Sequence, residues 1–123
     1  TVFEADLLVT DWSGIAYEYA FTTKKPVLFV DTPMKVMNPE YQKIDTVPIN
    51  IWMRDVIGDR LDPAKTEETE SKVRNLLEQK DAYHDRIEKF VEEYVYNLGN
   101  SAEVGAKYIV QAVQEQIKKA KEQ

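Results

Sequence analysis

Two short apolar runs, separated by a helical pattern, open the chain. The segment Ala5–Thr10 contains three consecutive apolar residues, and residues 27–30 form a second apolar run. Runs of this kind are typical of strands that are buried on both faces. Between them, apolar residues recur at helical spacing from Ile15 to Ala20, and Pro26 disfavours helix at the residue before it. The pattern predicts a β-α-β unit whose two strands are parallel and whose crossover is right-handed.

A long segment with three prolines follows the second strand. Residues 31–48 lack a regular period, and we expect an ordered loop there. Its first residues leave the carboxyl end of the second strand, at the same edge of the sheet as the turn after the first strand. Open parallel sheets bind ligands along this edge. A short third strand is expected at residues 49–53.

Helical patterns occupy the second half of the chain. A helix is predicted over residues 64–80, after a cap and first-turn proline at Asp62 and Pro63. An apolar stripe from Ile87 to Leu98 predicts the next helix, and Gly99 supplies a left-handed stop.

The last helix is expected to open at Asn100, with Glu103 completing a variant of the capping box. Its predicted buried face consists of Val104, Tyr108, Ile109, Ala112, Val113 and Ile117. Tyr94 and Tyr108 lie on the apolar stripes, so both are expected in the core.

Composition narrows the class of protein. The chain has 123 residues, 43% of them hydrophobic, which fits one globular domain over residues 1–123. Its net charge of -6 and the lack of a basic stripe argue against a nucleic-acid partner. With no cysteine and no apolar run long enough to span a membrane, a cytoplasmic location is expected. Because the chain begins at Thr1, close to a strand, we expect a piece of a longer protein.

The turn after the first strand is the candidate functional site. It contains Thr10, Asp11, Ser13 and Gly14, and a helix begins there. The first backbone N–H groups of a helix lack partners and its dipole is positive at this end. Such a corner favours a phosphate group.

The same residues carry a family resemblance. The stretch TDWSGIAYEYA resembles the TDYSS-x-x-x-D-Y-A signature of the CDP-glycerol glycerophosphotransferase family, and KKPVLFVDT resembles that family's next strand. The resemblance is specific over residues 5–31. In it, Ser13 matches the serine placed near the donor phosphates, Gly14 replaces a second serine, and Glu18 matches the acidic position.

The resemblance implies the fold and the activity. It implies a GT-B architecture of two facing Rossmann-like domains, of which this α/β chain, with its parallel sheet and helical C-terminal half, is the donor-binding C-terminal part. It further implies a transferase that builds a cell-surface polymer, such as teichoic acid or capsule, from CDP-glycerol or a similar nucleotide-diphosphate donor. The polymer acceptor and the catalytic histidine would belong to the missing N-terminal domain, so no catalytic residue is expected here, and neither a cofactor nor a metal. Peripheral association of the full-length protein with the inner face of the membrane is also expected.

Several residues keep alternative interpretations. The side chain of Ser13 or Asp11 could simply cap the helix, which is worth about 1 kcal/mol. The carboxylate of Glu18 could pair with Lys24 or Lys25, or contact the donor ribose. Asp31 and Lys35 are further candidate donor contacts at the start of the long loop. Lysines such as Lys35 and Lys43 are more often simply solvated.

Three other functions stay open. The first is a nucleotide-sugar glycosyltransferase domain. The second is a phosphoacceptor receiver domain with Asp11 as the acceptor. The order of elements opposes it, because a receiver has an acidic pair after its first strand and its acceptor aspartate near the middle of the chain, whereas Asp11 follows the first strand of this sequence. The third is a noncatalytic helical interaction module built on the last two stripes. His84 is the single histidine and is expected on a helix surface, so the chain cannot form a histidine-pair metal site or a complete serine triad.

Overall fold

The predicted β-α-β unit is confirmed. In the computed structural model, which describes residues 1–122, strand β1 (Leu8–Thr10) leads through helix α1 (Ile15–Thr23) into strand β2 (Val27–Val30). The two strands are parallel, with Thr10 opposite Phe29. Helix α1 ends at Thr23, and the next residue, Lys24, is its C-cap with a left-handed φ of 57°. The chain divides into two units, Thr1–Val91 and Glu92–Gln123, which are described separately below.

The third strand lies later in the sequence than predicted. Strand β3 (Gly58–Leu61) pairs in parallel with β2, so the sheet order is β1-β2-β3. The predicted strand at 49–53 is wrong: residues 49–52 form helix α2 (Ile49–Trp52), and Met53 is the turn between it and the next helix, α3 (Arg54–Ile57). Met53 and Ile57 are both buried and are four residues apart, which is helical spacing.

Burial differs between the first two strands. In the central strand β2, residues 27–29 are almost completely buried, as predicted. The prediction of burial on both faces is wrong for β1, which is three residues long and leaves Val9 50% exposed. β1 is the edge strand, and helix α4 (Thr69–Glu78) packs against β2 and β3. The central position, and not the apolar run alone, therefore determines which strand is covered.

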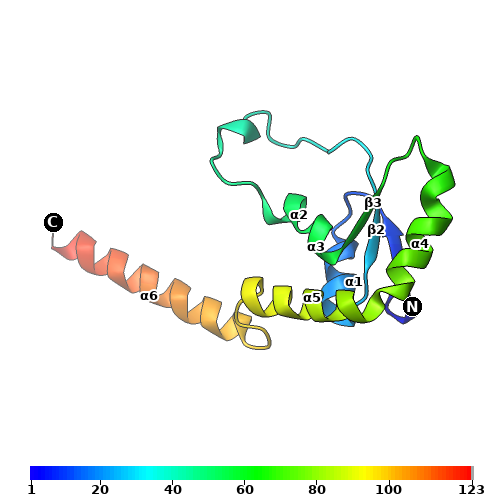
Figure 1. Ribbon diagram of the computed structural model, residues 1–123. Coiled ribbons are helices and arrows are strands. Elements are labelled where there is room, and N and C mark those ends of the chain that lie inside the picture. Colours follow the sequence, from blue (N-terminus) through cyan, green and yellow to red (C-terminus); the bar gives the residue numbers. More distant parts are fainter. Residues whose placement is uncertain (123) are drawn as a thin grey trace. The chain divides into compact units, whose positions relative to one another are not determined.

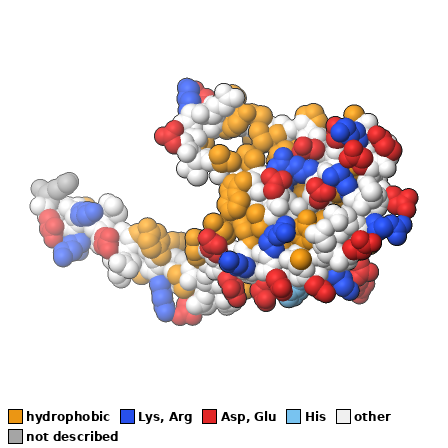
Figure 2. Space-filling model, viewed as in Figure 1, with side chains coloured by type: hydrophobic (Ala, Val, Ile, Leu, Met, Phe, Trp, Pro, Cys, Tyr) orange, Lys and Arg blue, Asp and Glu red, His pale blue; other side chains and the backbone are white. Residues whose placement is uncertain are grey.

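The long loop leaves the sheet and returns to α2, as Figure 1 shows. It contains one short 3-10 turn, η2 (Tyr41–Lys43). A similar turn, η1 (Val2–Glu4), precedes β1. The loop exposes large apolar side chains, and Figure 2 shows hydrophobic side chains gathered on it. They are Val36, Met37, Ile44 and Val47.

The helix predicted over 64–80 is shorter at its start. A 3-10 turn, η3 (Thr66–Glu68), precedes α4, and the Asp62 carboxylate accepts a hydrogen bond from the Ala64 N–H at 2.9 Å. Asp62 thus closes a turn and does not cap the helix. Helix α5 (Lys80–Tyr94) follows, and its inner residues are buried in the first unit. These are Tyr83, Ile87, Phe90 and Val91.

Helix α5 also ends earlier than predicted. Its last residue is Tyr94, which is 37% exposed, and Leu98 is 74% exposed outside any helix. Gly99 has the expected left-handed conformation, with φ of 85°, but it lies in the turn before the last helix. The stripe therefore extends past the helix that it predicted.

The second unit contains helix α6 (Ser101–Lys121). Asn100 is its N-cap, as predicted, but its side chain makes no capping hydrogen bond, so the capping box does not form. The predicted buried face is wrong, because no residue of α6 is buried and Tyr108 is 72% exposed. Among the described residues of this unit, no second long element is present to cover the stripe. Within the described residues, every helix is too short or too polar to cross a membrane.

Candidate functional site

The predicted corner lies between β1 and α1. Thr10 ends the strand, Asp11 is exposed, and Gly14 is the N-cap of the helix. No side chain makes a capping hydrogen bond here, so neither Ser13 nor Asp11 acts as a cap. In residues 1–122, no hydrogen bond is donated by the backbone N–H of Gly14 or Ile15. These amides are available to an acceptor from outside the chain.

The corner is open at Gly14. A Cβ atom built on this glycine would meet no atom within 4 Å, and its φ of -61° is accessible to any residue. Neither sterics nor backbone conformation therefore requires glycine here.

We predict that Gly14→Ser folds with an unchanged free energy of unfolding, within about 0.5 kcal/mol of the starting chain. The added hydroxyl enters open space, and serine is at least as good an N-cap as glycine. Urea denaturation followed by circular dichroism measures the difference. A loss well above this range would show that the corner is more crowded than the structure indicates.

Sequence reasoning missed the most unusual residue near this corner. Arg54, the first residue of α3, is 1% exposed and is the single buried charged residue in the described chain. Its guanidinium carbon lies 3.9 Å from the centre of the Trp12 ring and 4.8 Å from that of Phe29. A lone arginine within the apolar run IWMRDVI was the signal that could have revealed it.

Arg54 connects the corner to the end of β2. Its Nη1 atom lies 3.0 Å from the Oδ1 atom of Asp31, a side chain that is 39% exposed. The backbone N–H of Asp31 donates to the carbonyl of Leu61 at 2.8 Å, which ties Asp31 to β3. Asp31, predicted as a donor contact, is thus engaged in an ion pair.

Two aromatic residues of this region have defined polar contacts. The Trp12 indole N–H donates to the carbonyl of Thr32 at 2.7 Å. The Tyr17 hydroxyl donates to the carbonyl of Asn50 at 3.3 Å. Burial raises the pKa of Tyr17, and the positive charge of Arg54 opposes this rise. Tyr17 of α1 therefore lies within the electrostatic range of Arg54.

The side chains of Glu18 and of the two lysines after α1 form no hydrogen bond or ion pair with the corner residues, within the part of the chain that the structure describes. Glu18 is exposed, and of its two alternative roles the pairing with Lys24 or Lys25 is not found among the described residues, because both lysines have other partners. Lys24 donates to the carbonyl of Phe21, and Lys25 donates to the carbonyl of Ala5 at 2.7 Å and lies 3.7 Å from the Asp6 carboxylate.

The loop lysines behave differently from each other. Lys35 is exposed and has no ion pair among the described residues, whereas Lys43 pairs with Glu40. His84 is 51% exposed on α5, as expected for a helix surface. Within residues 1–122, no group of three or more histidine and acidic side chains is arranged to hold a metal ion.

A polar groove lies near the ends of β2 and β3. Its lining includes Asp31 and three cationic side chains, all of which have carboxylate partners. These ion pairs are Arg60–Asp55 at 2.7 Å, Lys65–Glu68 at 3.7 Å and Lys72–Asp59 at 2.8 Å. The groove therefore offers no uncompensated positive charge to an anion.

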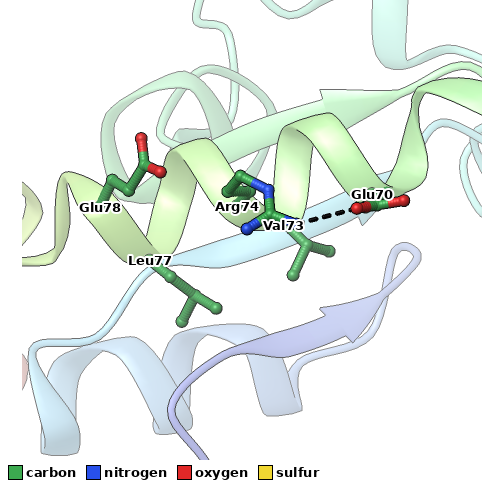
Figure 3. A pocket seen from close by; sticks show the side chains of 5 residues that line it. All are labelled: Glu70, Val73, Arg74, Leu77 and Glu78. Atoms are coloured by element: carbon green, nitrogen blue, oxygen red, sulfur yellow. Dashed lines mark hydrogen bonds and ion pairs between the residues drawn. The ribbon is translucent and has the colours of Figure 1, made fainter.

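Another pocket lies on α4, away from every predicted site residue. Figure 3 shows that its lining comes from one helix and includes the ion pair between Arg74 and Glu70, 2.8 Å apart. This pocket lies on the side of a single helix, so it offers neither the free helix-start amides nor the strand end that make up the corner.

The fold defines a Rossmann-like α/β fragment in which a helix with free first-turn amides begins at the carboxyl edge of a parallel sheet. Residues 1–113 match the family described as CDP-Glycerol:Poly(glycerophosphate) glycerophosphotransferase, and the chain belongs to this family. Searches of the curated proteins and of the solved structures found no match. The function is therefore of the glycerophosphotransferase type, and the family resemblance seen in the sequence is confirmed.

Proposed function

We propose that this chain is the donor-binding part of a longer transferase that uses a CDP-linked donor, such as CDP-glycerol, to build a cell-surface polymer. Family membership supports the reaction class. The choice of site rests on one observation: the backbone amides of Gly14 and Ile15 donate no hydrogen bond, and no side chain caps this end of the helix. A helix start of this kind binds phosphate groups, and the donor's diphosphate supplies two of them.

In this proposal the corner binds the donor diphosphate. The amides of Gly14 and Ile15 and the Ser13 hydroxyl donate to its oxygens, while Thr10 and Asp11 shape the turn. An exposed carboxylate repels a phosphate, so Asp11 would face a donor hydroxyl. Glu18 and Lys35 are exposed and unpaired among the described residues, which leaves both able to contact the donor.

The proposed reaction is a displacement at phosphorus. The acceptor hydroxyl attacks the β-phosphorus, and a new bond forms between the acceptor oxygen and that phosphorus. The bond from the β-phosphorus to the bridging oxygen breaks, and its electron pair leaves with the nucleoside monophosphate. The helix start and Ser13 stabilise the negative charge on this leaving group. The acceptor proton passes to a base on the other domain, which also binds the polymer, so this chain alone would bind donor without turnover.

The test of this proposal is an amide chemical-shift titration of the 123-residue chain with CDP-glycerol, CDP and a UDP-sugar. We expect saturable shifts in residues 10–15, with the CDP compounds binding more tightly than the UDP-sugar. Preference for the UDP-sugar would favour a nucleotide-sugar glycosyltransferase. If residues 10–15 do not respond to any of the three while the protein remains folded, the proposed site is wrong.

We predict that Ser13→Ala weakens CDP binding by about 1.5–3 kcal/mol, the range for a hydrogen bond to a charged group. Ser13 makes no capping bond, so its removal should leave the fold intact. Isothermal titration calorimetry measures the affinity. The matched control is Ser71→Ala on α4, where the hydroxyl donates to the carbonyl of Glu68. Equal affinities for the Ser13→Ala variant and the starting chain would remove this hydroxyl from the site.

A further inference from the structure

The guanidinium of Arg54 is buried but incompletely hydrogen-bonded. A guanidinium carries five N–H donors, and in Arg54 the Nη1 atom bonds to Asp31. The Nε and Nη2 atoms are buried and have no acceptor in residues 1–122. Buried charged groups in proteins are normally paired and hydrogen-bonded, because water no longer solvates them. A residue that departs from this rule calls for a specific explanation.

The position of Arg54 associates it with the corner. One face of the guanidinium lies against Trp12, which stands between Asp11 and Ser13. Phe29 is also within cation-π range, and it pairs with Thr10 across the sheet. The charge thus lies beside Trp12, a residue of the turn whose amides are free, and the indole covers one face of the guanidinium.

A purely structural role does not account for the unused donors. Contact with Trp12 and Phe29 requires a flat cation or an apolar group, and the ion pair with Asp31 uses one nitrogen. Buried ion pairs can often be replaced by apolar residues without loss of stability. The three N–H bonds on Nε and Nη2 take part neither in the ring contacts nor in the ion pair. The planar guanidinium is the side-chain group that can donate to two phosphate oxygens at once.

We propose that Arg54 is a ligand of the donor's diphosphate, with Trp12 as its cover in the free protein. On binding, the indole gives up its hydrogen bond to the Thr32 carbonyl and turns away from the guanidinium, and phosphate oxygens accept hydrogen bonds from Nε and Nη2. The inference rests on the proposed function, since it deepens the same corner. It adds a cation to a site that otherwise offers amides and a hydroxyl, and it makes Trp12 the residue that reports binding.

The test uses the 123-residue chain and inorganic pyrophosphate. The chain has two tryptophans, so the measurements are made in a Trp52→Phe variant, in which the tryptophan fluorescence comes from Trp12 alone. We expect a saturable fluorescence change, together with a shift of the Arg54 Nε–H resonance in proton-nitrogen spectra. Arg54→Lys keeps the charge but loses the fork, and Arg54→Met removes both. We expect affinity to fall about tenfold in the first and about 100-fold in the second.

The matched control is Arg74→Met, at an exposed arginine of α4 that pairs with Glu70. Its pyrophosphate affinity should be unchanged. The spread of the amide resonances shows whether each variant is folded. If Arg54→Met does not fold, the Arg54 Nε–H resonance of the chain that retains Arg54 still tests the proposal.

The outcomes separate the two proposals. If residues 10–15 respond to pyrophosphate while the Arg54 Nε–H does not shift and the Arg54 variants bind as tightly as the starting chain, the inference on Arg54 is wrong and the corner remains. If residues 10–15 do not respond to pyrophosphate or to CDP, the proposed function fails, and the role of Arg54 fails with it.

Discussion

Gly58→Ala is expected to lower the free energy of unfolding by about 3 kcal/mol or more, the upper range for overpacking a well-packed core. A Cβ atom at this position would lie 1.8 Å from the carbonyl oxygen of Val27 and 2.8 Å from its carbonyl carbon. Val27 is the residue paired with Gly58 in the parallel register of β2 and β3. Because the obstacle is backbone in the central strand, no side-chain rotation can relieve the contact.

Urea denaturation followed by circular dichroism measures this effect. The matched control is Gly14→Ser in the same unit, where the added atoms meet open space. We expect the two substitutions to differ by most of the predicted amount. Similar denaturation midpoints for both variants would mean that β3 does not approach Val27 as closely as the structure indicates.

The second large effect is expected at Asp31. Asp31→Ala should destabilise the protein by about 3 kcal/mol, because it leaves the buried guanidinium of Arg54 without a compensating charge. The Arg54 side chain is 1% exposed, so water cannot replace the lost partner. Asp31→Asn keeps an acceptor for Nη1 and removes only the charge, and we expect a smaller loss.

A double-mutant cycle checks the cause of this loss. In an Arg54→Met background, Asp31→Ala should change the free energy of unfolding by less than about 0.5 kcal/mol, since there is no buried charge left to compensate. The exposed pair between Glu70 and Arg74 provides the comparison, because Glu70→Ala should cost about 0.3–0.5 kcal/mol. An equal loss from Asp31→Ala with and without Arg54 would show that the ion pair is not its origin.

The first part of the fold was predictable because its signals are local. Helix α1 and strand β2 lie where apolar spacing and Pro26 place them, and the parallel pairing follows from the helical crossover between the two strands. The third strand was not predictable in this way. The stretch GDRL of β3 has two residues that are atypical of strands, Gly58 and Asp59, and it forms a strand because Gly58 fits against Val27 and the sheet continues there.

One part of the candidate site was also predictable from the sequence, and another part was not. The corner at Thr10–Gly14 follows from a strand that ends at a polar turn before a helix, and its position in the structure matches that expectation. Arg54 was missed because its burial depends on Trp12, which is 42 positions away in the sequence, and on Phe29 and Asp31. No periodicity in the segment around Arg54 indicates these contacts.

The sequence by itself determined the β-α-β unit, the helix start that follows the first strand, and the family to which the chain belongs. Only the tertiary structure decided which strand is central, that Asp31 pairs with a buried arginine, and that the stripe of α6 is not buried. The physical reason is the range of the interactions. Spacing, caps and breakers act over a few neighbouring residues, whereas burial and charge pairing depend on segments that only folding brings together.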